Sequence, residues 1–263
     1  MTYFAFLAVF LALPLAILAL LTGRDQRRGR RLPASLSGAP FWLVLLGHVI
    51  AALVYTTPWD NYLVATGVWW YNPDLVTGVT LGYVPIEEYT FFVLQTLFTG
   101  LWLLWWGKRL PAAVNTTAWP HLRLAASLAV GLLWLGSVAL LASGWQAGVY
   151  LGLILVWALP PVLIQMAFGA DILWRQRRLV AVGLVPIVLY LAAADALAIG
   201  SGTWTIDPGQ SFGITLAGVL PIEEFVFFLM TNVLIVFGAT LVLASASYQR
   251  LNELRARLPR SWA

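Results

Sequence analysis

The chain has 263 residues, of which 61% are hydrophobic and only 10% charged, with a mean hydropathy of +0.85. Soluble domains carry roughly 25% charged residues, so this composition excludes a soluble globular protein and indicates an integral membrane protein. The absence of Cys excludes disulfides and thiolate metal sites, and two His residues are too few for a histidine metal site, so no metal is expected.

Seven apolar runs of about 20 residues follow one another, and each is long enough to cross ~30 Å of hydrocarbon as a helix. The first run is too long for a signal peptide and lacks a basic start and a cleavage site, so we expect it to be retained. The predicted fold class is therefore an all-α membrane protein with seven transmembrane helices. The expected spans are residues 3–22, 38–57, 82–106, 122–142, 147–169, 179–199 and 216–244.

The distribution of basic residues predicts an orientation. All 15 Lys and Arg residues follow the first, third, fifth and seventh spans, which places them on one side of a seven-span chain. Basic loops face the cytoplasm, so we expect a protein of the cell membrane with its N-terminus outside and a cytoplasmic tail at residues 246–263. Alternating Arg and Leu in this tail predict a short interfacial helix.

The sequence contains an internal repeat. Residues 60–81 align without gaps on residues 195–216, at an offset of 135. One inserted residue later, Pro85-Ile86-Glu87-Glu88 matches Pro221-Ile222-Glu223-Glu224 at an offset of 136. We therefore expect two parallel three-span repeats related by a pseudo-two-fold axis along the membrane normal, with one central site built from both. The repeats are assigned to residues 1–110 and 145–245, with a connecting span at 111–144.

The duplicated Pro-Ile-Glu-Glu motif is the most informative element for function. We expect it about two turns inside spans three and seven, where ionisable groups are costly. Burial and a neighbouring carboxyl both disfavour ionisation, so at least one Glu of each motif is expected to be protonated at neutral pH. A neutral carboxylic acid in an apolar cavity is a strong proton donor. The candidate catalytic residues are therefore Glu87, Glu88, Glu223 and Glu224.

A structural explanation, in which the acids only hydrogen-bond helices together, stays open for the two aspartates of the repeat, because each is expected at the end of a span. Aromatic residues around the motif either form an interfacial belt or line a cavity in which a cation forms. Asp74 has no counterpart in the second repeat and is expected in a solvated loop. The candidate substrate-binding residues are Asp60, Asp195, Trp69, Trp204, Tyr89, Phe92, Phe225 and Phe228.

The sequence lacks the motifs that are typical of several other functions. The chain has no dinucleotide fingerprint, P-loop or zinc-protease motif, so no nucleotide or flavin cofactor is expected. A retinal Schiff base needs a lysine in the middle of a span, whereas the only lysine, Lys108, lies at a membrane edge. An aspartate-rich site for Mg²⁺ and diphosphate is also missing from the sequence. No nucleic-acid partner is expected.

On the duplicated motif, with the upstream Trp59-Asp60-Asn61 and Gly67-Val68-Trp69 segments, the chain resembles the membrane-integral lycopene cyclases. These are the heterodimeric-type carotenoid cyclases of bacteria and the cyclase half of fungal bifunctional phytoene synthase/lycopene cyclase. The resemblance covers nearly the whole chain. It implies a cofactor-independent enzyme that acts on lycopene or a related acyclic carotenoid in membrane lipid, alongside other enzymes of the carotenoid pathway.

The implied reaction is redox-neutral cyclisation of the ψ-ends of lycopene to β-rings, with one Glu as the acid and another as the base. Two alternatives stay open. A proton-coupled transporter would also use paired carboxylates in the membrane, and a carotenoid-binding protein would need no ionisable pair. A sealed apolar cavity that opens sideways to lipid favours the cyclase, whereas an aqueous path from one face favours transport.

Overall fold

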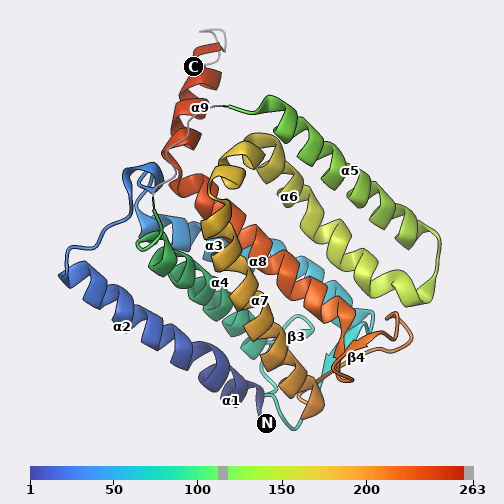
Figure 1. Cartoon of the computed structure of the whole chain (residues 1–263). Helices are drawn as coiled ribbons and strands as arrows, with labels where there is room; N and C mark the ends of the chain where they lie inside the picture. The colour runs from blue at the N-terminus through green and yellow to red at the C-terminus, as the bar shows by residue number, and fades with distance from the viewer. Residues whose placement is uncertain (112–117, 258–263) are drawn as a thin grey trace.

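The computed structural model describes residues 1–111 and 118–257 as a bundle of long helices with short strands at one end (Figure 1). Seven helical segments in these ranges are long and apolar enough to cross a membrane, which confirms the predicted fold class. The first segment comprises α1 (Tyr3–Leu7), a π-helical turn (Ala8–Ala12) and α2 (Leu13–Arg27). The others are α3 (Phe41–Ala65), α4 (Ile86–Gly107), α5 (Pro120–Ala142), α6 (Val149–Arg175), α7 (Arg177–Gly200) and α8 (Ile222–Leu243).

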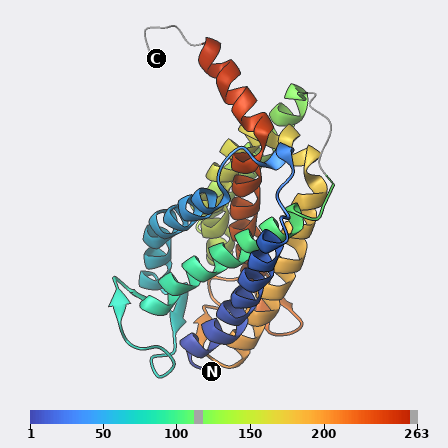
Figure 2. The same cartoon turned by 90° about the vertical axis from the view of Figure 1, so that its left-hand side faces the viewer.

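Residues 112–117 of the predicted connecting segment and 258–263 of the predicted tail lie outside the described residues. Helix α9 (Ser245–Arg257) forms the described part of the tail and projects from the bundle at the C-terminal end (Figure 2). The N-terminus and the strands lie at the opposite end of the bundle (Figure 1).

The predicted starts of the third and seventh spans are wrong. Helices α4 and α8 begin only at Ile86 and Ile222, directly after prolines that adopt extended backbone angles. A residue before proline favours extended backbone, whereas proline itself is well tolerated at a helix start. Residues 82–85 and 216–221 therefore belong to hairpins, and the Pro-Ile-Glu-Glu motifs lie at helix N-termini rather than two turns inside.

Two short hairpins precede these helices. Strand β2 (Thr80–Leu81) pairs with β3 (Val84–Pro85), and β5 (Thr215–Leu216) pairs with β6 (Leu220–Pro221). In the first hairpin Leu81 lies opposite Val84, and in the second Leu216 lies opposite Leu220, so the second turn is one residue longer. The inserted residue therefore lies in a turn, and the two Glu-Glu pairs keep equivalent positions.

A third strand pair joins the two repeats. Strand β1 (Trp69–Tyr71) runs antiparallel to β4 (Trp204–Ile206), with Trp69 opposite Ile206 and Tyr71 opposite Trp204. These residues are matched in the sequence repeat, Trp69 with Trp204 and Tyr71 with Ile206. The pairing is therefore symmetric, and the pseudo-two-fold axis passes through its central pair, Trp70 and Thr205.

Helices α4 and α8 are the most buried spans, whereas α3 and α5 are the most exposed. Two side-chain hydrogen bonds connect α4 to α8. Gln95 Nε2 donates to Thr231 Oγ1 at 2.9 Å, and Thr99 Oγ1 donates to Asn232 Oδ1 at 2.6 Å. Such polar contacts between helices are typical of membrane bundles, and they hold together the two helices that carry the glutamates.

Two ion-pair clusters join the helices at the C-terminal end of the bundle. Arg109 donates to both carboxylate oxygens of Asp25, at 2.8 and 3.1 Å. Arg250 of α9 donates to both oxygens of Asp171, at 2.9 and 2.6 Å. Two of the acids that the sequence places in basic segments thus bind arginines there.

Candidate active site

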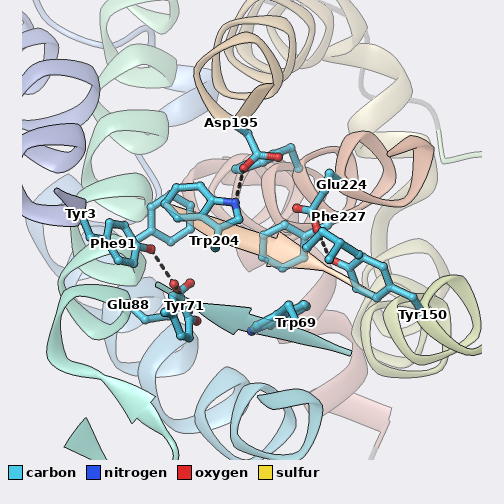
Figure 3. A pocket seen from close by; sticks show the side chains of 12 residues that line it. Tyr3, Trp69, Tyr71, Glu88, Phe91, Tyr150, Asp195, Trp204, Glu224 and Phe227 are labelled. Atoms are coloured by element: carbon cyan, nitrogen blue, oxygen red, sulfur yellow. Dashed lines mark hydrogen bonds between the residues drawn. The ribbon is translucent and has the colours of Figure 1, made fainter. Parts of the chain in front are cut away.

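A small cavity of about 40 Å³ lies beside the β1–β4 pair, between the two repeats (Figure 3). Each repeat contributes the second glutamate of its motif, and aromatic side chains make up most of the wall. The lining residues are Tyr3, Trp69, Tyr71, Glu88, Phe91, Tyr150, Asp195, Trp204, Ile206, Glu224, Phe227 and Phe228.

Each glutamate in the cavity accepts a hydrogen bond from a tyrosine at the start of another helix. Tyr3 of α1 donates to Glu88 Oε2 at 2.5 Å, and Tyr150 of α6 donates to Glu224 Oε1. The two tyrosines are equivalent, because each begins the first span of its repeat. The cavity therefore contains two pseudo-symmetric Tyr–Glu pairs (Figure 3).

The backbone supports this equivalence. The amide nitrogen of Tyr3 donates to the carbonyl of Leu75 at 2.8 Å, and that of Tyr150 donates to the carbonyl of Gln210 at 3.1 Å. Leu75 and Gln210 are themselves matched in the repeat. The loop before each hairpin thus fixes the tyrosine that contacts the glutamate.

The two halves differ in the further partners of their carboxyls. Glu88 Oε2 accepts a second hydrogen bond, from the hydroxyl of Tyr71 at 3.0 Å, whereas Ile206 takes the equivalent position in the other half. Desolvation by burial, followed by the charges of Asp60 and Glu88, raises the pKa of Tyr71 well above its usual value of 10. Tyr71 is thus a neutral phenol that donates to Glu88.

The aspartates of the repeat also differ. Asp195 Oδ1 accepts a hydrogen bond of 2.9 Å from Trp204 Nε1 in the cavity wall. Asp60 does not line this cavity, and its oxygens have no hydrogen-bond partner among the described residues. Both aspartates lie near the ends of their helices, as expected, with Asp60 and Asp195 each five residues before the last residue of α3 and α7. Both are only 1% exposed, so neither faces water. The predicted end of the second span at residue 57 is too early, because α3 continues through Pro58, which membrane helices tolerate.

The first glutamate of each motif lies outside the cavity. Glu87 Oε1 accepts a hydrogen bond from the backbone amide of Thr77 at 2.6 Å, and Glu223 Oε1 accepts one from the amide of Phe212 at 2.7 Å. Thr77 and Phe212 are matched in the repeat. Both glutamates are completely buried, and each ties the loop before its hairpin to the start of a helix.

The structure thus divides the candidate residues into three groups. The cavity contains Glu88, Glu224, Asp195, Trp69, Trp204 and Phe228. Phe92 lines a larger neighbouring cavity. Neither cavity is lined by Glu87, Glu223, Asp60, Tyr89 or Phe225.

Sequence reasoning missed Tyr3 and Tyr150. Their match needs a separate alignment of residues 3–14 on 150–161, which pairs Tyr3 with Tyr150 and Pro14 with Pro161. This offset differs from that of the glutamate motif, because the loops between the spans differ in length.

Aromatic rings from opposite repeats pack together around the carboxyls. The ring centroids of Tyr3 and Trp204 are 4.9 Å apart, and those of Trp69 and Tyr150 are 5.4 Å apart. Aromatic faces attract positive charge when water is excluded, so this wall suits a cationic intermediate. Within residues 1–111 and 118–257, no group of three His, Cys, Asp or Glu side chains is arranged to hold a metal ion.

Comparisons with known proteins point to one family. Residues 1–106 and 144–243 match the family model described as lycopene cyclase, which leaves out most of the connecting span. The chain is 41% identical over 242 residues to a lycopene beta-cyclase of Halobacterium salinarum, covering 91% of this chain and 95% of that protein. It is 40% identical over 198 residues to a bifunctional lycopene cyclase/phytoene synthase of Podospora anserina, covering 72% of this chain and 33% of that protein. No solved structure matches.

Proposed function

Because the chain belongs to the lycopene cyclase family, we propose that it converts the ψ-ends of lycopene to β-rings by acid–base cyclisation without net redox change. One observation carries the chemistry: Glu88 and Glu224, one from each repeat, line the same aromatic cavity. The reaction needs an acid, a base and surroundings that exclude water and stabilise a cation.

In the proposed reaction, a carboxylic acid transfers its proton to C2 of the terminal isoprene unit, which leaves the cation at C1. The C5=C6 double bond then attacks C1, so the C1–C6 bond forms and the cation moves to C5. A carboxylate removes the proton from C6, which restores the C5=C6 double bond in a β-ring. One proton enters and one leaves, so no oxidant or reductant is needed.

We propose Glu88 as the base and Glu224 as the acid. Hydrogen bonds donated to a carboxylate stabilise its charged form. Glu88 Oε2 accepts two phenol hydrogen bonds, from Tyr3 and Tyr71. The equivalent of Tyr71 near Glu224 is the apolar Ile206. This difference supports a charged resting state for Glu88 and a protonated one for Glu224.

The remaining candidates take supporting roles in this proposal. Glu87 and Glu223 position the hairpin loops through their backbone contacts rather than reacting. Trp69, Trp204 and Phe228 surround the reacting end, and Asp195 orients Trp204. We retain the division into repeats at residues 1–110 and 145–245, and the orientation with the N-terminus outside, as parts of the same proposal.

The direct test is incubation of purified protein with lycopene in liposomes, without flavin, nicotinamide or metal, followed by pigment analysis. We expect β-rings to form under these conditions. An absolute requirement for reduced flavin would refute the acid–base reaction. Proton movement across the liposome membrane without any ring formation would favour the transporter instead, and bound but unchanged lycopene would indicate a carotenoid-binding protein.

A further inference from the structure

A second cavity, of about 340 Å³, lies between α3, α4, α6 and α8. Its volume is within the range of small-molecule sites, about 300–1,000 Å³, whereas the cavity with the two glutamates is far smaller. A carotenoid that places one end between the glutamates must therefore extend into another space. The second cavity is lined in part by Ala51, Ala52, Tyr55, Phe92, Trp157 and Leu234.

The two cavities are neighbours, because Phe227 lines both. Two aromatic residues of the wall, Phe227 and Trp157, stack on Trp59, which lines neither cavity. The Phe227 ring lies 5.8 Å from Trp59 at an interplanar angle of 8°, and Trp59 lies 4.5 Å from Trp157 at 19°. The rings that line the cavity, Phe92, Trp157 and Phe227, offer an apolar surface to a conjugated chain.

The second cavity also reaches the side of the bundle. Among its lining residues, Ala51 and Tyr55 of α3 are exposed. They lie within a membrane-spanning helix, so this opening faces lipid rather than water. The Tyr55 hydroxyl donates to the Trp157 carbonyl at 2.8 Å and joins α3 to α6 at the opening.

At three lining positions the second cavity carries smaller side chains than the matched positions of the repeat do. Tyr190 donates to the Phe10 carbonyl at 3.0 Å as Tyr55 donates to the Trp157 carbonyl, which fixes the equivalence of the two halves. The matched positions carry larger side chains: Ile187 for Ala52, Leu191 for Thr56, and Phe98 of the first repeat for Leu234 of the second.

The larger side chains at the matched positions are packed into the core. Ile187, Leu191 and Phe98 are 3%, 1% and 6% exposed. The Phe98 ring also packs edge-on against Tyr190 at 5.7 Å. The fold therefore accommodates larger side chains at these matched positions, and the smaller residues Ala52, Thr56 and Leu234 leave space in the second cavity.

We propose that the second cavity binds the conjugated polyene arm of the acyclic carotenoid, which enters it sideways from the bilayer between α3 and α6. This proposal rests on the proposed function. The end of the hydrocarbon then reaches the two glutamates past Phe227. The proposed carotenoid chamber lies on the side of α3, although the two repeats are similar.

The test introduces the larger residues of the matched positions: Ala52→Ile, Thr56→Leu and Leu234→Phe. Each is made in a Glu224→Gln background to stop turnover, and lycopene bound to purified protein is measured by its visible absorbance and circular dichroism. We expect about a 10-fold or greater loss of affinity, because pocket methylenes change binding by this amount. Leu46→Phe and Val54→Ile, at exposed positions of α3, are the matched controls and should bind normally.

A second measurement avoids variants that fold poorly. The chain has no Cys, so Ala52→Cys introduces a single small thiol into the cavity wall. Lycopene should slow its alkylation by an apolar thiol reagent, whereas Leu46→Cys should react at the same rate with and without lycopene. The proposal would be overturned if lycopene left the alkylation rate of Ala52→Cys unchanged, or if the three variants with larger side chains bound lycopene normally.

The proposed function and the chamber can fail separately. If lycopene protects the thiol of Ala52→Cys in protein that keeps Glu224, but no rings form, the proposed function is refuted and the chamber is still supported.

Discussion

The hydroxyl of Tyr3 lies 2.5 Å from Glu88 Oε2 and joins the first helix to the second glutamate of the motif, 85 residues away. Tyr150 makes the equivalent contact with Glu224. Because each tyrosine lies on a different helix from its glutamate, the position of each carboxyl depends on the packing of two spans. This relationship distinguishes the two glutamates of each motif, which look alike in the sequence.

The first prediction separates these glutamates. Glu88→Gln and Glu224→Gln keep the shape of the side chain but remove proton transfer, so each should lower turnover by about 100-fold or more. Glu87→Gln and Glu223→Gln keep an oxygen that can accept the loop amide, and they should retain most of the turnover. Pigment analysis of purified variants gives the turnover, and thermal unfolding gives their stability. Loss of turnover in Glu87→Gln with normal stability would place the first glutamate in the chemistry.

The second prediction concerns the phenols. Tyr3→Phe removes a hydrogen bond to the charged Glu88, and Tyr150→Phe removes one to the carboxylate that Glu224 becomes when it gives up its proton. A hydrogen bond to a charged group is worth about 1.5–3 kcal/mol. We expect turnover to fall by about 10-fold or more in both variants. Tyr62→Phe, at a residue that is 53% exposed on α3, is the control and should behave like the wild type. Equal turnover in all three variants would show that the phenols do not support the glutamates.

The sequence is sufficient to predict the seven spans and the repeat, because apolar length and the duplicated motif are both local signals. It places the motif too deep, because an apolar run does not show where a helix begins, and Pro85 and Pro221 delay both starts. It cannot pair Tyr3 with Glu88, since that contact depends on how distant helices pack. The difference between Tyr71 and Ile206 is visible in the alignment, but its meaning requires the β1–β4 pairing.

The third prediction follows from the assignment of Glu88 as the base. In Glu88→Gln the C5 cation still forms from the proton of Glu224, but the group that removes the C6 proton is missing. The residual product should therefore include rings with the double bond at C4–C5, formed by loss of a neighbouring proton. Chromatography with nuclear magnetic resonance of the product identifies the ring type. If Glu224→Gln gives these rings and Glu88→Gln does not, the two roles are reversed.

The fourth prediction tests the orientation in the membrane. The chain has no Cys, so Asp74→Cys at the strand end and Glu253→Cys on α9 each provide one exposed label. An impermeant maleimide should modify Asp74→Cys in intact cells, because the end of the bundle that carries the strands is expected to lie outside. Glu253→Cys should react only after the cells are permeabilised. The opposite labelling pattern would mean that the basic segments face outwards.

The fifth prediction follows the proton that starts the reaction. Glu224 should transfer an exchangeable proton to C2, whereas the proton removed from C6 comes from the substrate. Product formed in D₂O should therefore carry one deuterium per ring, at C2, as measured by mass spectrometry and nuclear magnetic resonance. Transport and simple carotenoid binding produce no ring and no label, so this experiment separates the three functions. Rings without deuterium at C2 would show that an exchangeable carboxyl does not protonate the substrate, even if the fold and the orientation in the membrane are correct.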